Sequence, residues 1–262
     1  MENKIKQGST HTFPLPPKNN NKPGFKKWIK YIWTGLVAVV LGIAFLFFAI
    51  SQGFLGDMPE VQELENPDIY VASEIISSDG VQLGKFEKEK TIPITYKDLP
   101  QHLIYALQAK EDERFREHSG IDMKSIARAI RYGGARGGGS TITQQLAKLL
   151  FTGNASQNKI QRAFQKLKEW VVAVSLEKRY TKEEIVTLYF NKFDFLHNAN
   201  GIELASKIYF NKSAKDLNLS EAATFVAMLE NPRRNNPIRY MDRAIKRRNV
   251  VLDQMLETGY ID

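Results

Sequence analysis

EDERFREHSG at residues 111–120 and GGSTITQQLAK at residues 138–148 are the two stretches that decide the fold of this chain. The first is a cluster of charged residues, and the second is a polar run led by glycines. A basic stretch that contains Lys166 and Glu169 follows both of them. This order brings carboxylates, hydroxyls, amides and cations into one region, which favours an enzyme site for an anionic substrate.

A helix is predicted to begin after Asp98 and to run through Lys110, at the edge of the acidic stretch. Asp98 is a residue type that caps helix N-termini, and Leu103 belongs to the apolar side of the helix that would follow. If this helix continues to His118, then Glu111, Phe115 and His118 share one face at spacings of four and three.

A second helix is predicted to begin near Asp122. Its apolar residues Ile126, Ala129 and Ile130 have the spacing of a buried stripe. The helix should end at the glycines of segment 133–139, and we expect that segment to form a mobile loop.

A third helix combines an apolar stripe with a charged face. Arg162, Lys166 and Glu169 step by four and three, so one carboxylate stands beside two cations. Steps of four and three also place a set of apolar residues on the opposite side, where we expect them to face a core. These residues are Ile160, Phe164, Leu167, Val171 and Val174.

The N-terminal part of the chain predicts a single-pass membrane protein. An uncharged run, residues 31–56, would reach roughly 39 Å as a helix and exceeds a hydrocarbon core of about 30 Å. Seven lysines and one glutamate precede the run, and acidic residues follow it, which predicts a cytoplasmic amino terminus. A cleaved signal peptide is the competing interpretation, but the run is longer than the apolar core of such peptides.

Between the span and the helices, the sequence predicts a β-hairpin. Segments 69–76 and 81–86 are rich in β-branched and aromatic residues, and Asp79-Gly80 between them suits a tight turn. The predicted organisation is therefore a disordered basic cytoplasmic tail (1–27), a transmembrane helix (28–56), a linker with the hairpin (57–98) and a mainly α-helical domain (99–262).

Composition excludes several functional classes. The 262 residues carry a net charge of +8 and include no cysteine, so no disulfide framework exists. The glycine-rich run lacks the Lys-Ser/Thr ending of a nucleotide-binding loop, and we expect no organic cofactor. A basic domain outside the cytoplasm does not meet nucleic acid, so no nucleic-acid partner is predicted.

Several motifs occur in a fixed order along the chain. They are Glu-Asp-x-x-Phe-x-x-His-x-Gly at 111–120, Gly-Gly-Ser-Thr-Ile-Thr-Gln-Gln-Leu-Ala-Lys at 138–148, Lys-x-x-Glu at 166–169, and Lys-Glu-Glu-Ile-Val-Thr-Leu-Tyr-Phe-Asn at 182–191. This set closely resembles the signature motifs of the family 51 peptidoglycan glycosyltransferases. Each charged segment by itself would be interpreted as ordinary solvated surface. The occurrence of all these motifs in the family's order argues against that interpretation.

The resemblance implies a lysozyme-like, mainly helical domain with a known chemistry. Such enzymes polymerise lipid II into β-1,4 glycan strands with inversion and release undecaprenyl diphosphate, outside the bacterial cytoplasmic (inner) membrane. It implies that Glu111 is the general base and Glu169 the second catalytic carboxylate. The resemblance further implies a set of substrate-binding residues. They are Asp112, Arg114, Phe115, His118, Arg128, Ser140, Thr141, Gln144, Gln145, Lys148, Arg162, Lys166 and Asn191.

The resemblance also implies partners, and the chemistry of the residues raises the question of a metal. The partners are lipid II with the growing glycan strand, the membrane, and proteins of cell-wall synthesis or division. Oxygen ligands suit Mg²⁺ or Mn²⁺, and Glu169 is the candidate ligand for such a divalent metal, although it would equally orient a lysine. An apolar patch beside Lys148 either contacts the bilayer surface or packs in the core; it consists of Leu146, Leu149, Leu150 and Phe151.

Two other functional classes stay open. A lysozyme-like lytic enzyme would use a catalytic glutamate on the same fold, but its glycan substrate carries no diphosphate. A noncatalytic membrane-anchored cell-wall scaffold would explain the span and the charge without chemistry. No Ser-x-x-Lys set with the partners of a penicillin-binding transpeptidase is present, so we expect no peptide cross-linking by these residues.

Overall fold

The computed structural model describes residues 25–54, 73–79, 82–86, 91–133, 138–153 and 155–262. The chain divides into two compact units, Met1–Phe48 and Ala49–Asp262. The predicted basic tail up to residue 24 and most of the predicted linker, 55–72, lie outside the described residues.

The first unit is built around one long apolar helix. Helix α1 begins at Phe25 and ends at Ser51, and its segment Lys27–Ile50 is long and apolar enough to cross a membrane. Its large side chains, among them Trp28 and Phe45, are exposed. An apolar helix without a protein core to cover it has the surface that a lipid environment requires.

The predicted hairpin is present. Strand β1 (Ser73–Ile76) pairs antiparallel with strand β2 (Gln82–Phe86), and the register shifts between Ile75 and Ile76. The strands are shorter than the predicted segments; residues 69–72 and Gly80 of the predicted turn lie outside the described residues.

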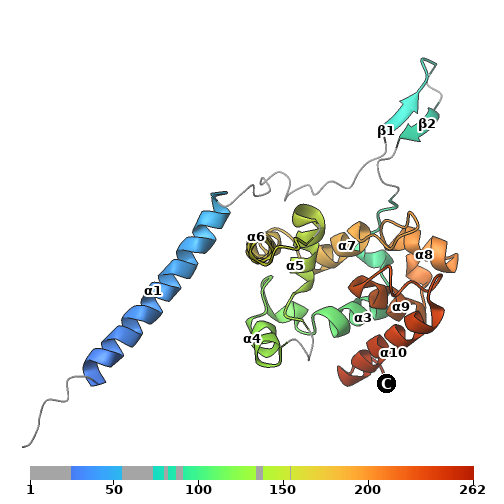
Figure 1. Ribbon diagram of the computed structural model, residues 1–262. Coiled ribbons are helices and arrows are strands. Elements are labelled where there is room, and N and C mark those ends of the chain that lie inside the picture. Colours follow the sequence, from blue (N-terminus) through green and yellow to red (C-terminus); the bar gives the residue numbers. More distant parts are fainter. Residues whose placement is uncertain (1–24, 55–72, 80–81, 87–90, 134–137, 154) are drawn as a thin grey trace, which may run out of the picture. The chain divides into compact units, whose positions relative to one another are not determined.

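Helices make up the rest of the second unit, which confirms the predicted mainly α-helical class (Figure 1). In chain order the elements are η1 (Tyr96–Asp98), α3 (Gln101–Glu111), η2 (Phe115–Glu117), α4 (Met123–Arg131), α5 (Ile142–Ala147), η3 (Lys148–Thr152), α6 (Lys159–Glu177), α7 (Lys182–Lys192), α8 (Ile202–Phe210), η4 (Ala214–Asp216), α9 (Leu219–Glu230) and α10 (Met241–Glu257).

Helix α9 is the centre of one half of the core. It packs against both α3 and α10, and its residues Ala222–Leu229 are buried except Thr224. A helix that is apolar on nearly all sides must be surrounded by other elements. In the other half, α5 packs against α6 and α7. The core therefore fixes α3, α5, α6 and α7, which carry the polar motifs.

The predicted helix after Asp98 is present but does not continue to residue 118. Helix α3 ends at Glu111, and Phe115 lies in the separate turn η2. Asp98 does not cap α3, because its carboxylate accepts hydrogen bonds from the backbone and hydroxyl of Thr95 and closes turn η1 instead. Glu111 therefore stands at a helix end, where the chain turns away.

Helix α4 begins as predicted and packs differently. The Asp122 carboxylate accepts hydrogen bonds from the backbone of Lys124 and Ser125, which confirms it as the N-cap. The predicted buried stripe is wrong, since Ile130 is 78% exposed and α4 has no buried residue. The short helix packs through Ile126 onto Gly139 rather than onto an apolar core.

The predicted orientation of α6 is also wrong. Ile160 is 70% exposed, whereas the buried positions are Glu169, Val172, Ala173 and Leu176. Phe164 is exposed as well, so the apolar stripe in the first half of α6 is not buried in the core. The charged face of the helix is thereby turned inward, toward α5.

The apolar residues around Lys148 belong largely to the core. Leu146 is fully buried, and Leu149, Leu150 and Phe151 are partly buried against the core cluster. Residues Lys148–Thr152 form a π-helical turn that continues α5. Such turns occur often at functional sites, and this one begins at a predicted substrate-binding lysine.

Gly120 joins the start of α5 to α6. Its φ is +89°, and a Cβ at this position would lie 2.9 Å from the backbone carbonyl atoms of Ala173 in α6. Its carbonyl oxygen accepts hydrogen bonds from the Thr141 hydroxyl at 2.8 Å and from the Gln144 amide at 3.1 Å. Only glycine allows this conformation and this close approach together.

We expect Gly120→Ala to lower the free energy of unfolding by about 2–5 kcal/mol, from positive-φ strain plus the backbone clash. Thermal and chemical denaturation measure this. The matched control is Gly259→Ala, at φ +73° with open space around the added methyl group. Equal losses in the two variants would contradict a role for close packing at Gly120.

Candidate active site

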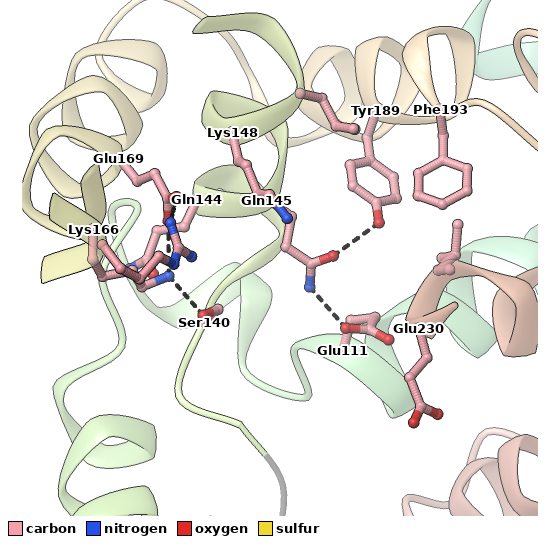
Figure 2. A pocket seen from close by; sticks show the side chains of 13 residues that line it. Glu111, Ser140, Gln144, Gln145, Lys148, Lys166, Glu169, Tyr189, Phe193 and Glu230 are labelled. Atoms are coloured by element: carbon pink, nitrogen blue, oxygen red, sulfur yellow. Dashed lines mark hydrogen bonds and ion pairs between the residues drawn. The ribbon is translucent and has the colours of Figure 1, made fainter. Parts of the chain in front are cut away.

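The polar motifs meet in a cavity of about 320 Å³ between α3, α5, α6 and α7 (Figure 2). Its wall is basic on the α6 side and carries the carboxylate of Glu111 on the other side. The lining residues are Glu111, Ser140, Gln144, Gln145, Lys148, Leu149, Arg162, Lys166, Glu169, Tyr189, Phe193, Leu229 and Glu230.

A second cavity, of about 290 Å³, adjoins the first. Glu111, Ser140 and Gln145 line both cavities, so these residues stand at the boundary. The second cavity is lined further by residues of α3, α4 and α10: Ala109, Lys110, Asp112, Glu113, Ser125, Arg128, Gly138, Gln254, Glu257 and Thr258. We call the first the basic cavity and the second the α10 cavity.

Glu111 is held by an amide rather than by a cation. Its Oε2 accepts a hydrogen bond of 2.7 Å from Nε2 of Gln145. Burial raises the pKa of Glu111 above its ordinary 4.5, and this effect outweighs the hydrogen bond from Gln145, which lowers the pKa. A carboxylate with a raised pKa accepts a proton more readily near neutral pH.

Gln145 is itself held from the opposite side. The hydroxyl of Tyr189, in α7, donates a hydrogen bond of 2.9 Å to its Oε1, as Figure 2 shows. Tyr189 is 1% exposed. The three side chains therefore form one line from the core of the domain to the boundary between the cavities.

The basic cavity contains a buried carboxylate between two cations. Glu169 is 1% exposed; its Oε1 lies 2.6 Å from Nη1 of Arg162 and its Oε2 lies 3.1 Å from Nζ of Lys166. Nζ of Lys166 also donates to the Ser140 hydroxyl at 2.7 Å. With Lys148, three cations face one carboxylate, so this wall has a net positive charge that favours an anion.

The Glu169 site does not have the donor set of a divalent cation. Both of its oxygens contact cationic side chains, and the described residues contain no group of three His, Cys, Asp or Glu side chains able to hold a metal. Oxygen-ligated Mg²⁺ or Ca²⁺ needs several oxygen donors directed at one point. Glu169 is placed to orient Arg162 and Lys166.

Three predicted site residues of the acidic stretch make contacts within the protein that stabilise the backbone around the site. The carboxylate of Asp112 lies 3.0 Å from Nε2 of His118 and accepts a hydrogen bond from the backbone of Ile142 at 3.1 Å. Phe115 is 1% exposed and packs edge-on against the His118 ring. Of the three, only Asp112 lines a cavity.

Other predicted substrate contacts have partners within the protein. Arg114 forms an ion pair of 2.7 Å with Asp122, and Thr141 caps α5. The amide of Asn191 exchanges two hydrogen bonds with the backbone of Ile94, at 3.1 and 2.9 Å. Arg128 lines the α10 cavity. Their roles toward a substrate stay predictions.

Sequence reasoning missed several lining residues. Tyr189 and Phe193 stand one helical turn apart on α7, a spacing that looks like ordinary core packing. Glu230, at the end of α9, has no signal in the sequence, because the fold alone brings it to the cavity. The α10 residues Gln254 and Glu257 reach the second cavity in the same way.

Comparison with known proteins identifies the family of this chain. A sequence model of the transglycosylase family matches residues 79–256, which is more than half of the chain. Penicillin-binding protein 1A of Pseudomonas aeruginosa is 35% identical over 239 residues, covering 89% of this chain and 28% of the relative. Penicillin-binding protein 1A of Haemophilus influenzae is 40% identical over 203 residues, covering 76% of this chain and 23% of the relative.

Penicillin-binding protein 1F of Bacillus subtilis is 36% identical, covering 86% of this chain and 31% of the relative. This chain thus spans less than a third of the length of each of these relatives. A crystal structure of penicillin-binding protein 1A from Haemophilus influenzae matches at 25% identity with a TM-score of 0.40, covering 74% of this chain and 19% of that chain. The chain belongs to the transglycosylase family and carries the peptidoglycan glycosyltransferase domain that its motifs resemble.

Proposed function

We propose that this chain polymerises lipid II into β-1,4 glycan strands with inversion and releases undecaprenyl diphosphate, while helix α1 anchors it in the membrane. The observation that carries the proposal is the place of Glu111. It stands between a cavity with a cation cluster and a second cavity, as a base must when it joins two large substrates.

Glu111 acts as the general base. The acceptor hydroxyl oxygen attacks the anomeric carbon of the donor sugar from the face opposite the diphosphate, and Glu111 takes the hydroxyl proton. The carbon–oxygen bond to the diphosphate breaks, and its electron pair leaves with the phosphate oxygen. An α-linked donor therefore yields a β-linked product.

The cations of the basic cavity stabilise the leaving group. Lys148, Arg162 and Lys166 face the space in which a diphosphate would gain negative charge. Glu169 keeps Arg162 and Lys166 in position and leaves the Lys148 ammonium group to the substrate. A divalent metal would bring further positive charge to the diphosphate, but the Glu169 oxygens do not fit its ligand set, because they already contact cations.

The membrane presents the substrate. A polyprenyl diphosphate stays at the bilayer, so an enzyme anchored by α1 meets it at the surface. We propose a single-pass topology with the amino terminus in the cytoplasm and the second unit outside it, on the basis of the lysines before the span. Proteins of cell-wall synthesis or division are the proposed partners of the whole protein.

The cation cluster favours transfer over lysis. A lytic enzyme cleaves a glycan that carries no diphosphate, and the positive wall around Lys148 would then have no anion to bind. A noncatalytic scaffold would need neither this wall nor a carboxylate with a raised pKa.

Glu111→Gln is expected to fold normally and to lose lipid II polymerisation by at least about 100-fold, because an amide cannot take the proton. The matched control is Glu117→Gln, an exposed acid of the same stretch outside both cavities. Polymer length on gels measures transfer, and release of muropeptides from sacculi measures lysis. Polymerisation that survives Glu111→Gln, or release of muropeptides by the intact chain, would contradict the proposal.

The decline of kcat/KM for lipid II at acid pH should report the protonation of Glu111. Its pKa in the folded protein is raised above 4.5, so activity requires a pH above that raised value and falls as protons are added. We expect kcat/KM for lipid II to decline on the acid side around a midpoint above pH 4.5. A midpoint at or below 4.5, with the protein still folded, would show that another group limits the reaction.

A further inference from the structure

We infer that Tyr189 is a positioning residue for the base: its hydroxyl fixes the amide of Gln145 so that the NH₂ group faces Glu111. This inference rests on the proposed function, because it concerns how the carboxylate at position 111 is kept ready to take a proton. Tyr189 itself touches no reacting atom in this arrangement.

The contacts form a directed chain. The Tyr189 hydroxyl donates to Oε1 of Gln145 at 2.9 Å, and Nε2 of Gln145 donates to Oε2 of Glu111 at 2.7 Å. A side-chain amide has a donor end and an acceptor end of nearly the same shape, so its orientation is decided by its neighbours. Here a donor stands at one end and a carboxylate at the other, and both favour the same orientation.

The alternative orientation of the Gln145 amide favours a different protonation state of Glu111. If the amide turned over, its oxygen would face Glu111, which is favourable only when Glu111 carries a proton to donate. The arrangement with Tyr189 as donor therefore stabilises the charged form of Glu111. Burial, and next the negative charge of Glu111, raise the pKa of Tyr189 well above 10, so the hydroxyl keeps its proton throughout the working range.

The surroundings hold the tyrosine rigidly. Its ring packs against Phe190 and Phe193, and helix α7 is fixed at its start by the capping box of Thr181 and Glu184. Phenylalanine would fill nearly the same volume, so packing alone does not require a hydroxyl here. The hydroxyl donates a hydrogen bond to the amide of Gln145, at the edge of the basic cavity.

Other charges act on Glu111 from several elements. Lys110, beside it on α3, lowers its pKa, whereas Glu230 at the end of α9 and the neighbouring Asp112 raise it. These charges are unchanged when the Tyr189 hydroxyl is removed. A change in the pH profile of a Tyr189→Phe variant therefore reports on the hydrogen-bond chain rather than on the net charge of the site.

Tyr189→Phe is the direct test. We expect the acid limb of kcat/KM for lipid II to move to higher pH by roughly 0.4–1 unit, which is the effect of one hydrogen bond on a titration. On that limb the rate falls about 2.5- to 10-fold, and it recovers as the pH rises. A loss that is the same at every pH, or an unchanged profile, would overturn the inference.

Two further variants separate positioning from packing. Tyr209→Phe also removes a tyrosine hydroxyl, one on a half-buried residue that donates to the Phe195 carbonyl away from both cavities, and it should leave the acid limb in place. Gln145→Met removes the amide, so it should shift the limb in the same direction, and adding Tyr189→Phe to it should cause no further shift. An additional shift of the acid limb in the double variant would contradict the proposed hydrogen-bond chain from Tyr189 through Gln145 to Glu111.

The outcomes distinguish this inference from the proposed function. If Glu111→Gln abolishes polymerisation while Tyr189→Phe keeps the wild-type profile, the hydrogen-bond chain is wrong and the base assignment stands. If Glu111→Gln still polymerises lipid II, both fail. Should Tyr189→Phe not fold, Tyr189→Met, which also removes the hydroxyl and whose flexible side chain adapts to the space, serves as the second variant, and an unchanged acid limb in it would overturn the inference.

Discussion

The site depends on keeping a carboxylate and a group of cations close together without pairing them. Glu111 contacts an amide, and burial raises its pKa. Had Lys148 or Lys166 reached it, the ion pair would have lowered that pKa and made Glu111 a weaker base for the proposed reaction. Glu169 provides the carboxylate for Arg162 and Lys166 instead, within the wall of the basic cavity. Gln145 stands between Glu111 and Tyr189 and gives the base a neutral donor.

The fold provides this separation through helix α5. It packs against α6, which carries the cations, and against α7, which carries Tyr189. The backbone of Gly120 accepts hydrogen bonds from both Thr141 and Gln144 at the start of α5 and lies directly on α6. Asp112 bonds the backbone of Ile142, so the residue next to Glu111 also holds α5. The motifs therefore stabilise the frame as much as they line the cavities.

Much of this could be predicted from the sequence where the signal is local. Asp122 as a helix cap and the hairpin between β1 and β2 depend on neighbouring residues alone, and both are confirmed. The inner face of α6 could not be predicted from its apolar spacing, because Ile160 and Phe164 form a stripe that no core covers among the described residues. Tyr189 was missed for a similar reason: a buried aromatic residue on a helix gives the same pattern whether its hydroxyl is used or not.

The most direct test of the account is a structure of the chain bound to an unreactive diphosphate analogue of the lipid-linked donor together with an acceptor sugar. The account predicts diphosphate oxygens within about 3 Å of the side-chain nitrogens of Lys148 and of Arg162 or Lys166. It also places the acceptor hydroxyl within hydrogen-bonding distance of Glu111. A diphosphate bound away from these cations, or an acceptor hydroxyl out of reach of Glu111, would contradict it.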